Sequence, residues 1–123
     1  MKKKILVIED ETGIRKVIRD FLLAEGFQIT EATNGQEGLD TFMDNDFDLV
    51  ILDIMMPDIK GYEVCKKIKE NSETSQTRII VLSAYMDDEK FRIMKEHGAD
   101  ACFSKPLPLP QLKEEVARML ELI

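Results

Sequence analysis

The sequence predicts one α/β domain built around a parallel β-sheet, and three observations lead to this fold class. Four short apolar runs occur along the chain, with the aliphatic and β-branched composition of strands that are covered on both faces. Segments with helical spacing of apolar residues separate these runs, so strands and helices alternate as in βαβ units. The 123 residues suffice for five such units and a hydrophobic core, and we expect a single domain over residues 1–123.

The first unit begins with a strand at residues 5–8, and the helix after it has one apolar stripe, formed by Ile14, Val17, Ile18, Phe21 and Leu22. Thr12 is expected to cap the start of this helix, and Gly26 stands where a left-handed residue commonly ends one. Residues 27–30 alternate in polarity, which predicts a half-covered edge strand.

The second helix is expected to begin after Asn34, whose side chain can cap it, while Glu37 reaches back to the cap amide. Its buried face is predicted to consist of Leu39, Phe42 and Met43.

A buried strand at residues 49–52 precedes the third helix, whose apolar stripe comprises Val64, Cys65 and Ile68. Another buried strand follows at residues 79–82.

Asp87 can cap a fourth helix, which carries Phe91 and Met94 and ends at His97-Gly98. After a strand at residues 101–104, the last helix begins near Pro110, a residue that the first turn tolerates. The buried face of this last helix is predicted to be formed by Leu112, Val116, Met119, Leu120 and Ile123.

Composition excludes several classes of function. The net charge is −7 and no basic patch is present, so we expect no direct binding to nucleic acid. No apolar run approaches the roughly 20 residues of a membrane span, and no signal-peptide core follows the basic start, which predicts a cytoplasmic protein without membrane insertion. Cys65 and Cys102 are interpreted as buried thiols, and a single histidine makes a zinc site improbable.

Polar residues directly follow the four buried runs. Glu9 and Asp10 follow the first, Asp53 the second, Ser83 the third and Lys105 the fourth. In open α/β sheets, ligands bind at the carboxyl ends of the strands. We therefore expect three carboxylates, a hydroxyl and an ammonium to converge at one edge of the sheet.

Such a cluster suits a divalent cation and phosphoryl chemistry. The three carboxylates repel one another, so part of the cluster should have a raised pKa, and Mg²⁺, which prefers oxygen ligands, would neutralise it. An aspartate carboxylate can attack phosphorus to form an acyl phosphate. Lys105 is the candidate ammonium that stabilises the transferred group, Ser83 can donate a hydrogen bond to it, and Ala84 leaves it room. Whether the Lys105-Pro106 bond is cis is left open by the sequence.

These motifs, in this order and spacing, resemble the receiver domain of bacterial two-component response regulators over essentially the whole chain. The segments that carry the resemblance are Ile5–Glu11, Leu49–Asp58, Gly61, Leu82–Ala84 and Gly98–Pro106. The resemblance implies a flavodoxin-like (βα)5 fold, a three-layer sandwich around a five-stranded parallel sheet of order 2-1-3-4-5.

The resemblance also implies roles for individual residues. It makes Asp53 the phosphoacceptor, and Glu9 and Asp10 the acidic pair that binds Mg²⁺ together with the backbone carbonyl of Met55. Lys105 would contact the phosphoryl group. Ser83 would be the switch hydroxyl that moves toward it.

The implied partners are a sensor histidine kinase or a histidine phosphotransfer protein as phosphoryl donor. An output protein would bind the face formed by the fourth helix, the fifth strand and the fifth helix. The chain would act as a monomer or weak dimer.

Several positions depart from the family pattern. Cys102 occupies the place of the usual switch aromatic, and strand alternation directs the neighbouring Phe103 to the opposite face, so we infer an altered output switch. Ala101 and Glu115 stand where members with winged-helix DNA-binding domains usually carry an acidic residue and an arginine.

Two further positions adjoin the expected site. Met55 and Tyr85 lie two residues beyond Asp53 and Ser83 and flank the path of the attacking water. We hypothesise that they tune dephosphorylation.

The predicted function is a stand-alone, Mg²⁺-dependent receiver without an output domain, which assists its own phosphorylation and dephosphorylation but is not a conventional enzyme. It would serve as a phosphorelay intermediate or a diffusible regulator. The alternatives are an excised N-terminal receiver of a larger regulator, a docking module that works unphosphorylated, an aspartyl-phosphate phosphatase, and an electron carrier that binds FMN.

Overall fold

The computed structural model describes residues 2–54, 60–70, 76–84, 86–106 and 108–120. Within these residues, one parallel sheet contains β1 (Lys4–Ile8), β2 (Gln28–Ala32), β3 (Leu49–Asp53), β4 (Arg78–Ser83) and β5 (Ala101–Ser104). The strand order is β2-β1-β3-β4-β5, which confirms the predicted topology.

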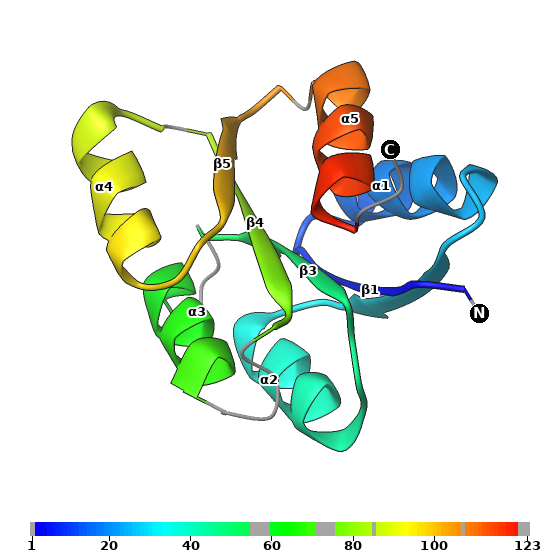
Figure 1. The fold of residues 1–123 in the computed structure, drawn as a ribbon, viewed down its shortest axis with the longest axis horizontal. Coiled ribbons are helices and arrows are strands. Elements are labelled where there is room, and N and C mark those ends of the chain that lie inside the picture. Colours follow the sequence, from blue (N-terminus) through cyan, green and yellow to red (C-terminus); the bar gives the residue numbers. More distant parts are fainter. Residues whose placement is uncertain (1, 55–59, 71–75, 85, 107, 121–123) are drawn as a thin grey trace.

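Five helices connect the strands and cover both faces of the sheet. They are α1 (Thr12–Ala24), α2 (Gly35–Asp44), α3 (Gly61–Glu70), α4 (Asp88–Glu96) and α5 (Leu109–Met119). Helices α1 and α5 lie together on one side of the sheet, and α2, α3 and α4 lie on the other (Figure 1). The predicted three-layer α/β/α sandwich is therefore confirmed.

Two separate hydrophobic clusters fill the spaces between the layers. Leu6 and Ile8 of β1 face the cluster shared with α2, α3 and α4, whereas Ile5 and Val7 face the cluster shared with α1 and α5. Successive side chains of a strand point to opposite faces, and all four of these side chains are fully buried. This double coverage is the reason that the strand sequence is apolar at every position.

The predicted helix ends are mostly confirmed. The side chains of Asn34 and Asp87 accept hydrogen bonds from the backbone N–H groups of Glu37, at 2.8 Å, and Lys90, at 2.7 Å. Gly26 has a φ of 93°, the left-handed conformation expected after α1.

Two predictions about capping were wrong. Thr12 is the first residue of α1 and Glu11 occupies the cap position, where no side chain makes a capping hydrogen bond. The Glu37 carboxylate accepts hydrogen bonds from the hydroxyl of Thr33, at 2.9 Å, and from the backbone N–H of Thr33. It does not reach the amide of Asn34, contrary to the prediction.

Val17 and Met43, which were assigned to apolar helix faces, are exposed, and so is Phe91 of α4. Val17 is 50% exposed, Met43 52% and Phe91 40%. Each lies at the margin of its apolar stripe, and a helix that rests on a sheet buries only the centre of that stripe. Cys102, which was expected to be buried, is half-buried, and Ile123 lies outside the described residues.

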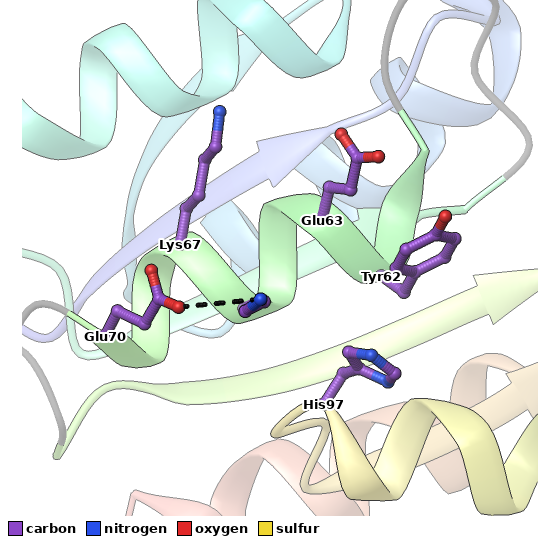
Figure 2. Close-up of a pocket in the computed structure, with 6 residues that line it drawn as sticks. Tyr62, Glu63, Lys67, Glu70 and His97 are labelled. Atoms are coloured by element: carbon purple, nitrogen blue, oxygen red, sulfur yellow. Dashed lines mark ion pairs between the residues drawn. The ribbon is translucent and has the colours of Figure 1, made fainter.

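A groove lies between α3 and the end of α4. Its volume is about 330 Å³, and it is lined by Tyr62, Glu63, Lys66, Lys67, Glu70 and His97. The rings of Tyr62 and His97 are in contact, with centroids 5.3 Å apart, and Lys66 pairs with Glu70 along α3 (Figure 2).

No helix in the described part of the chain is long and apolar enough to span a bilayer.

Candidate functional site

The parallel register brings the predicted polar residues to one edge of the sheet. Ile8, the last residue of β1, pairs with Leu52, so Glu9 and Asp53 follow at the same level on neighbouring strands. Asp53 in turn pairs with Leu82, which places Ser83 beside this level on β4. The convergence expected from the sequence is therefore present in the fold.

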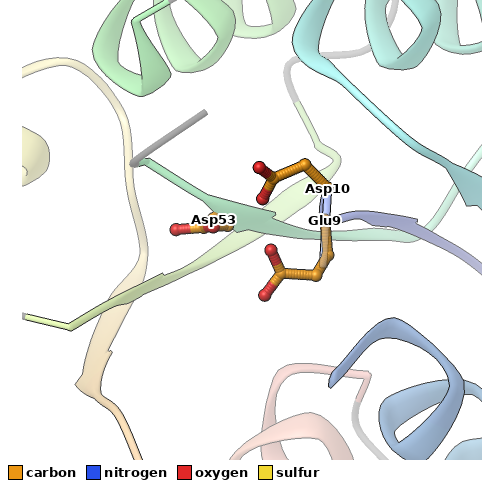
Figure 3. A group of neighbouring side chains, drawn as sticks. All are labelled: Glu9, Asp10 and Asp53. Atoms are coloured by element: carbon orange, nitrogen blue, oxygen red, sulfur yellow. The ribbon is translucent and has the colours of Figure 1, made fainter. Parts of the chain in front are cut away.

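Glu9, Asp10 and Asp53 form an acidic cluster, in which each residue offers a carboxylate oxygen and these oxygens lie within 4.8 Å of one another (Figure 3). Glu9 is 1% exposed and Asp53 is 3% exposed, whereas Asp10 is open to solvent. We refer to these three residues as the acidic cluster below.

Lys105 extends into the acidic cluster from the end of β5. Its Nζ donates to Oε1 of Glu9, at 2.9 Å, and lies 3.4 Å from Oδ2 of Asp53. The pKa of Lys105 is raised above its ordinary value. Partial burial alone would lower it, but the hydrogen bond to Glu9 and the charges of Asp53 and Glu9 have the larger combined effect. The ammonium therefore stays charged and partly neutralises the buried carboxylates.

The pKa of Glu9 is raised to about 7. Burial is the main cause, followed by a hydrogen bond shared with Asp53, while Lys105 acts in the opposite direction. The direction agrees with the raised pKa expected within the acidic cluster, but burial, and not repulsion between the carboxylates, is its main cause.

Ser83 and Lys105 are tied together through the backbone. The N–H of Lys105 donates to the carbonyl of Ser83 at 2.7 Å, and Ser83 is fully buried. The Lys105-Pro106 bond is cis, which answers the question that the sequence left open. Ala84, the next residue along, is exposed.

The donor set of the acidic cluster fits Mg²⁺. Three carboxylates offer the hard oxygen ligands that this ion requires, and the exposure of Asp10 leaves room for the waters that the ion keeps. Met55 and Tyr85, predicted as a further ligand and as tuning positions, lie outside the described residues.

Cys102 and Phe103 project from opposite faces of β5. Cys102 packs against the cluster of α2, α3 and α4, and Phe103 packs against the cluster of α1 and α5, as strand alternation predicts. Burial raises the pKa of the Cys102 thiol to about 11, so this side chain is a neutral apolar group at neutral pH.

Sequence reasoning missed Arg15, which lies against the acidic cluster. One terminal nitrogen of its guanidinium, Nη1, donates to the backbone carbonyl of Glu9 at 3.0 Å. The available signal was a basic residue between Ile14 and Ile18 of the apolar stripe, one turn after an acidic pair.

Comparisons with known proteins agree with this site. Residues 5–117 match the response regulator receiver domain family. The chain is 34% identical over 122 residues to sporulation initiation phosphotransferase F of Bacillus subtilis, and the alignment covers 99% of this chain and 97% of that protein.

A second relative is longer than this chain. The transcriptional regulatory protein SrrA of Staphylococcus aureus is 37% identical over 106 residues, which are 86% of this chain but only 43% of SrrA. The chain therefore spans less than half the length of that regulator.

Solved structures give the same result. A CheY-like response regulator receiver domain protein from Methanospirillum hungatei superimposes with a TM-score of 0.92 at 28% identity, covering 98% of this chain and 95% of that one. Fold, strand-end residues and sequence agree, and the chain belongs to the response regulator receiver domains of two-component signalling.

Proposed function

We propose that the chain accepts a phosphoryl group on Asp53 in a reaction that requires Mg²⁺. The observation that carries this proposal is the ammonium of Lys105, held 3.4 Å from Oδ2 of the buried Asp53 beside two further carboxylates. A buried nucleophile with a fixed cation and an oxygen-rich metal site is the arrangement that phosphoryl transfer needs.

In this proposal, an Asp53 oxygen forms a bond to phosphorus while the phosphorus–nitrogen bond of a donor phosphohistidine breaks. The electron pair of that bond remains on the imidazole nitrogen of the donor. Lys105 turns from Glu9 toward the incoming phosphoryl oxygens, and the hydroxyl of Ser83 donates a hydrogen bond to one of them. These groups position and stabilise the charge that spreads over the oxygens.

Glu9, Asp10 and Asp53 would hold the Mg²⁺, with the Met55 carbonyl proposed as a further ligand. The bound ion neutralises charge on the phosphoryl oxygens and on the carboxylates. Glu9 would give up its proton when it binds the ion, because the cation favours the charged carboxylate.

The proposed donors are a sensor histidine kinase or a histidine phosphotransfer protein, and the phosphotransferase relative in Bacillus subtilis supports a phosphorelay role. The output partner would bind the face of α4, β5 and α5, where Cys102 replaces the aromatic residue and alters the switch. We propose that residues 1–123 act as one receiver domain, which is a monomer or a weak dimer. Its only chemistry would be to assist its own phosphorylation and dephosphorylation. The alternative is that the chain is the receiver part of a larger regulator, because the related SrrA is more than twice as long as the matched region.

The test is incubation with acetyl phosphate, with Mg²⁺ or with EDTA, followed by intact mass measurement. We expect one phosphoryl addition that requires Mg²⁺ and disappears in Asp53→Asn. Asp40→Asn, which changes an exposed aspartate on α2, is the matched control and should still be modified. A folded wild-type protein without any addition would contradict the proposal and favour a docking module that works unphosphorylated.

A further inference from the structure

Arg15 is a charged side chain that α1 turns toward the protein interior. The residue is 8% exposed. Nη1 of its guanidinium donates to the carbonyl of Glu9 at 3.0 Å, and Nε donates to Oε1 of Glu31 on β2, also at 3.0 Å. A buried guanidinium is stable only when its donors are satisfied, so these two bonds fix where the group lies.

The carbonyl that Arg15 binds belongs to the peptide between Glu9 and Asp10. The N–H of Glu9 donates to the carbonyl of Ala32 at 3.1 Å, so β2 holds one side of this residue. Strand β1 ends at Ile8, and the chain then turns away toward α1. Arg15 therefore supplies a contact to the carbonyl of Glu9, at the point where the chain has left the strand.

We infer that Arg15 is a positioning residue that sets the spacing of the Glu9 and Asp10 carboxylates for a divalent cation. Rotation of the Glu9–Asp10 peptide would move both side chains, and the guanidinium resists that rotation because Glu31 anchors it. The inference rests on the proposed function of the acidic cluster and adds a residue that acts on metal affinity. Groups that orient metal ligands commonly contribute tenfold or more to that affinity.

The planar guanidinium is suited to this role. Its Nε and Nη1 point in fixed, different directions and reach a carboxylate on β2 and a carbonyl after β1 at the same time. A lysine at this position has a single nitrogen on a flexible stem, without the fixed separation and direction of the guanidinium donors, so it holds the peptide less firmly.

The test compares Arg15→Met and Arg15→Lys with Arg19→Gln as the matched control. Arg19 lies one turn further along α1 and also contacts Glu31, at 3.3 Å, but it pairs with the side chains of Asp20 and Glu31 and not with the Glu9–Asp10 peptide. Mg²⁺ affinity is measured by calorimetry. We expect Arg15→Met to bind about tenfold more weakly, Arg15→Lys to be intermediate and Arg19→Gln to stay within about twofold of wild type.

A readout in metal-free protein separates positioning from general damage to the fold. In EDTA, the amide resonance of Asp10 should shift and its hydrogen exchange should accelerate in Arg15→Met, while amides in β3 and β4 keep their wild-type values. Phosphorylation by acetyl phosphate should need more Mg²⁺ but reach the wild-type rate at saturation.

An unchanged Asp10 amide and an unchanged Mg²⁺ affinity in Arg15→Met would overturn the inference. If Arg15→Met does not fold, Arg15→Lys serves for the same test. A Mg²⁺ affinity of Arg15→Lys equal to that of wild type would then also overturn the inference. A wild-type protein that binds no Mg²⁺ or takes up no phosphoryl group would instead overturn the proposed function on which the inference rests.

Discussion

Glu9 is a carboxyl group at a position where its negative charge is costly. It is 1% exposed, it shares a hydrogen bond with Asp53, and its pKa is raised to about 7. An unfolded chain would return this pKa to its ordinary value near 4.5. Between these two values the folded protein binds more protons than the unfolded protein, so folding stability depends on pH.

We predict that the metal-free protein becomes less stable as the pH rises from about 5 to about 7. The raised pKa of folded Glu9 means that its stabilising contribution is complete below pH 4.5 and is lost as the pH passes through 7. The loss should be on the order of 2 kcal/mol in the free energy of unfolding. Urea denaturation in EDTA at several pH values measures it.

The matched pair for this experiment is Glu9→Gln and Glu114→Gln. The first variant should remove most of the pH dependence, whereas the second changes an exposed residue of α5 and should retain it. Equal pH dependence in both variants would show that Glu9 is not the group responsible.

The sequence could predict the acidic cluster because parallel strands place their ends at one edge. Glu9, Asp53 and Lys105 each directly follow or end a buried run, and the register needs no side-chain information to bring them together. Arg15 could not be found in this way because its target is the carbonyl of Glu9. Every residue has a carbonyl, so no pattern of residue types indicates which one an arginine will bind.

At the scale of elements, helix α2 rests unusually close to strand β1. A Cβ atom added to Gly38 would lie within 3.0 Å of the Ile8 side chain, closer than real Cβ contacts. Met43, at the margin of the apolar stripe of the same helix, is exposed although its spacing suggested burial. Periodicity predicts the direction of a helix face, but its width depends on the surface beneath it.

We predict that Gly38→Ala lowers the free energy of unfolding by about 1 kcal/mol. Alanine has the higher helix propensity, but overpacking against the fully buried Ile8 outweighs that gain. Gly13→Ala in α1, where nothing lies within 4 Å of the added atom, is the control and should be neutral or stabilising. Urea denaturation of both variants measures the difference.

The double variant with Ile8→Val tests the cause of the Gly38→Ala effect. Removing the Ile8 terminal methyl group should cost less in the Gly38→Ala background than in wild type. Additive effects would exclude the proposed contact.

At the scale of the whole molecule, Asp100, which directly precedes β5, joins α3, β4 and β5 at the sheet edge opposite the acidic cluster. Its Oδ2 accepts from the backbone N–H of Ile79, at 2.8 Å, and from Nζ of Lys69 on α3, at 3.2 Å. Its own N–H donates to the Ile79 carbonyl, which ties the start of β5 to the start of β4.

We predict that Asp100→Asn destabilises the fold by about 1 kcal/mol and Asp100→Ala by about 2 kcal/mol. Asparagine keeps an acceptor for the Ile79 N–H but loses the charge that Lys69 faces, while alanine removes both. Lys66→Gln, which breaks an exposed pair with Glu70 on the same helix, should change stability little. Thermal and urea unfolding measure all three, and equal losses in Asp100→Ala and Lys66→Gln would contradict the prediction.

The overall architecture was predictable because it depends on alternation and not on individual contacts. Apolar runs and amphipathic segments fixed the number and kind of elements, and the strand order followed from the family resemblance. The link from Asp100 to Lys69 was not predictable, because the two residues are 31 positions apart and neither belongs to an apolar pattern.

The bond between Lys105 and Glu9 joins residues that are 96 positions apart, almost the full span of the fold. During synthesis on a ribosome, Glu9 emerges early, whereas Lys105 emerges only after the strands of the sheet have been made. Until then the buried carboxylates lack their ammonium. A nascent or truncated chain that ends before β5 therefore lacks the ammonium that contacts Glu9 and Asp53, and the site stays incomplete.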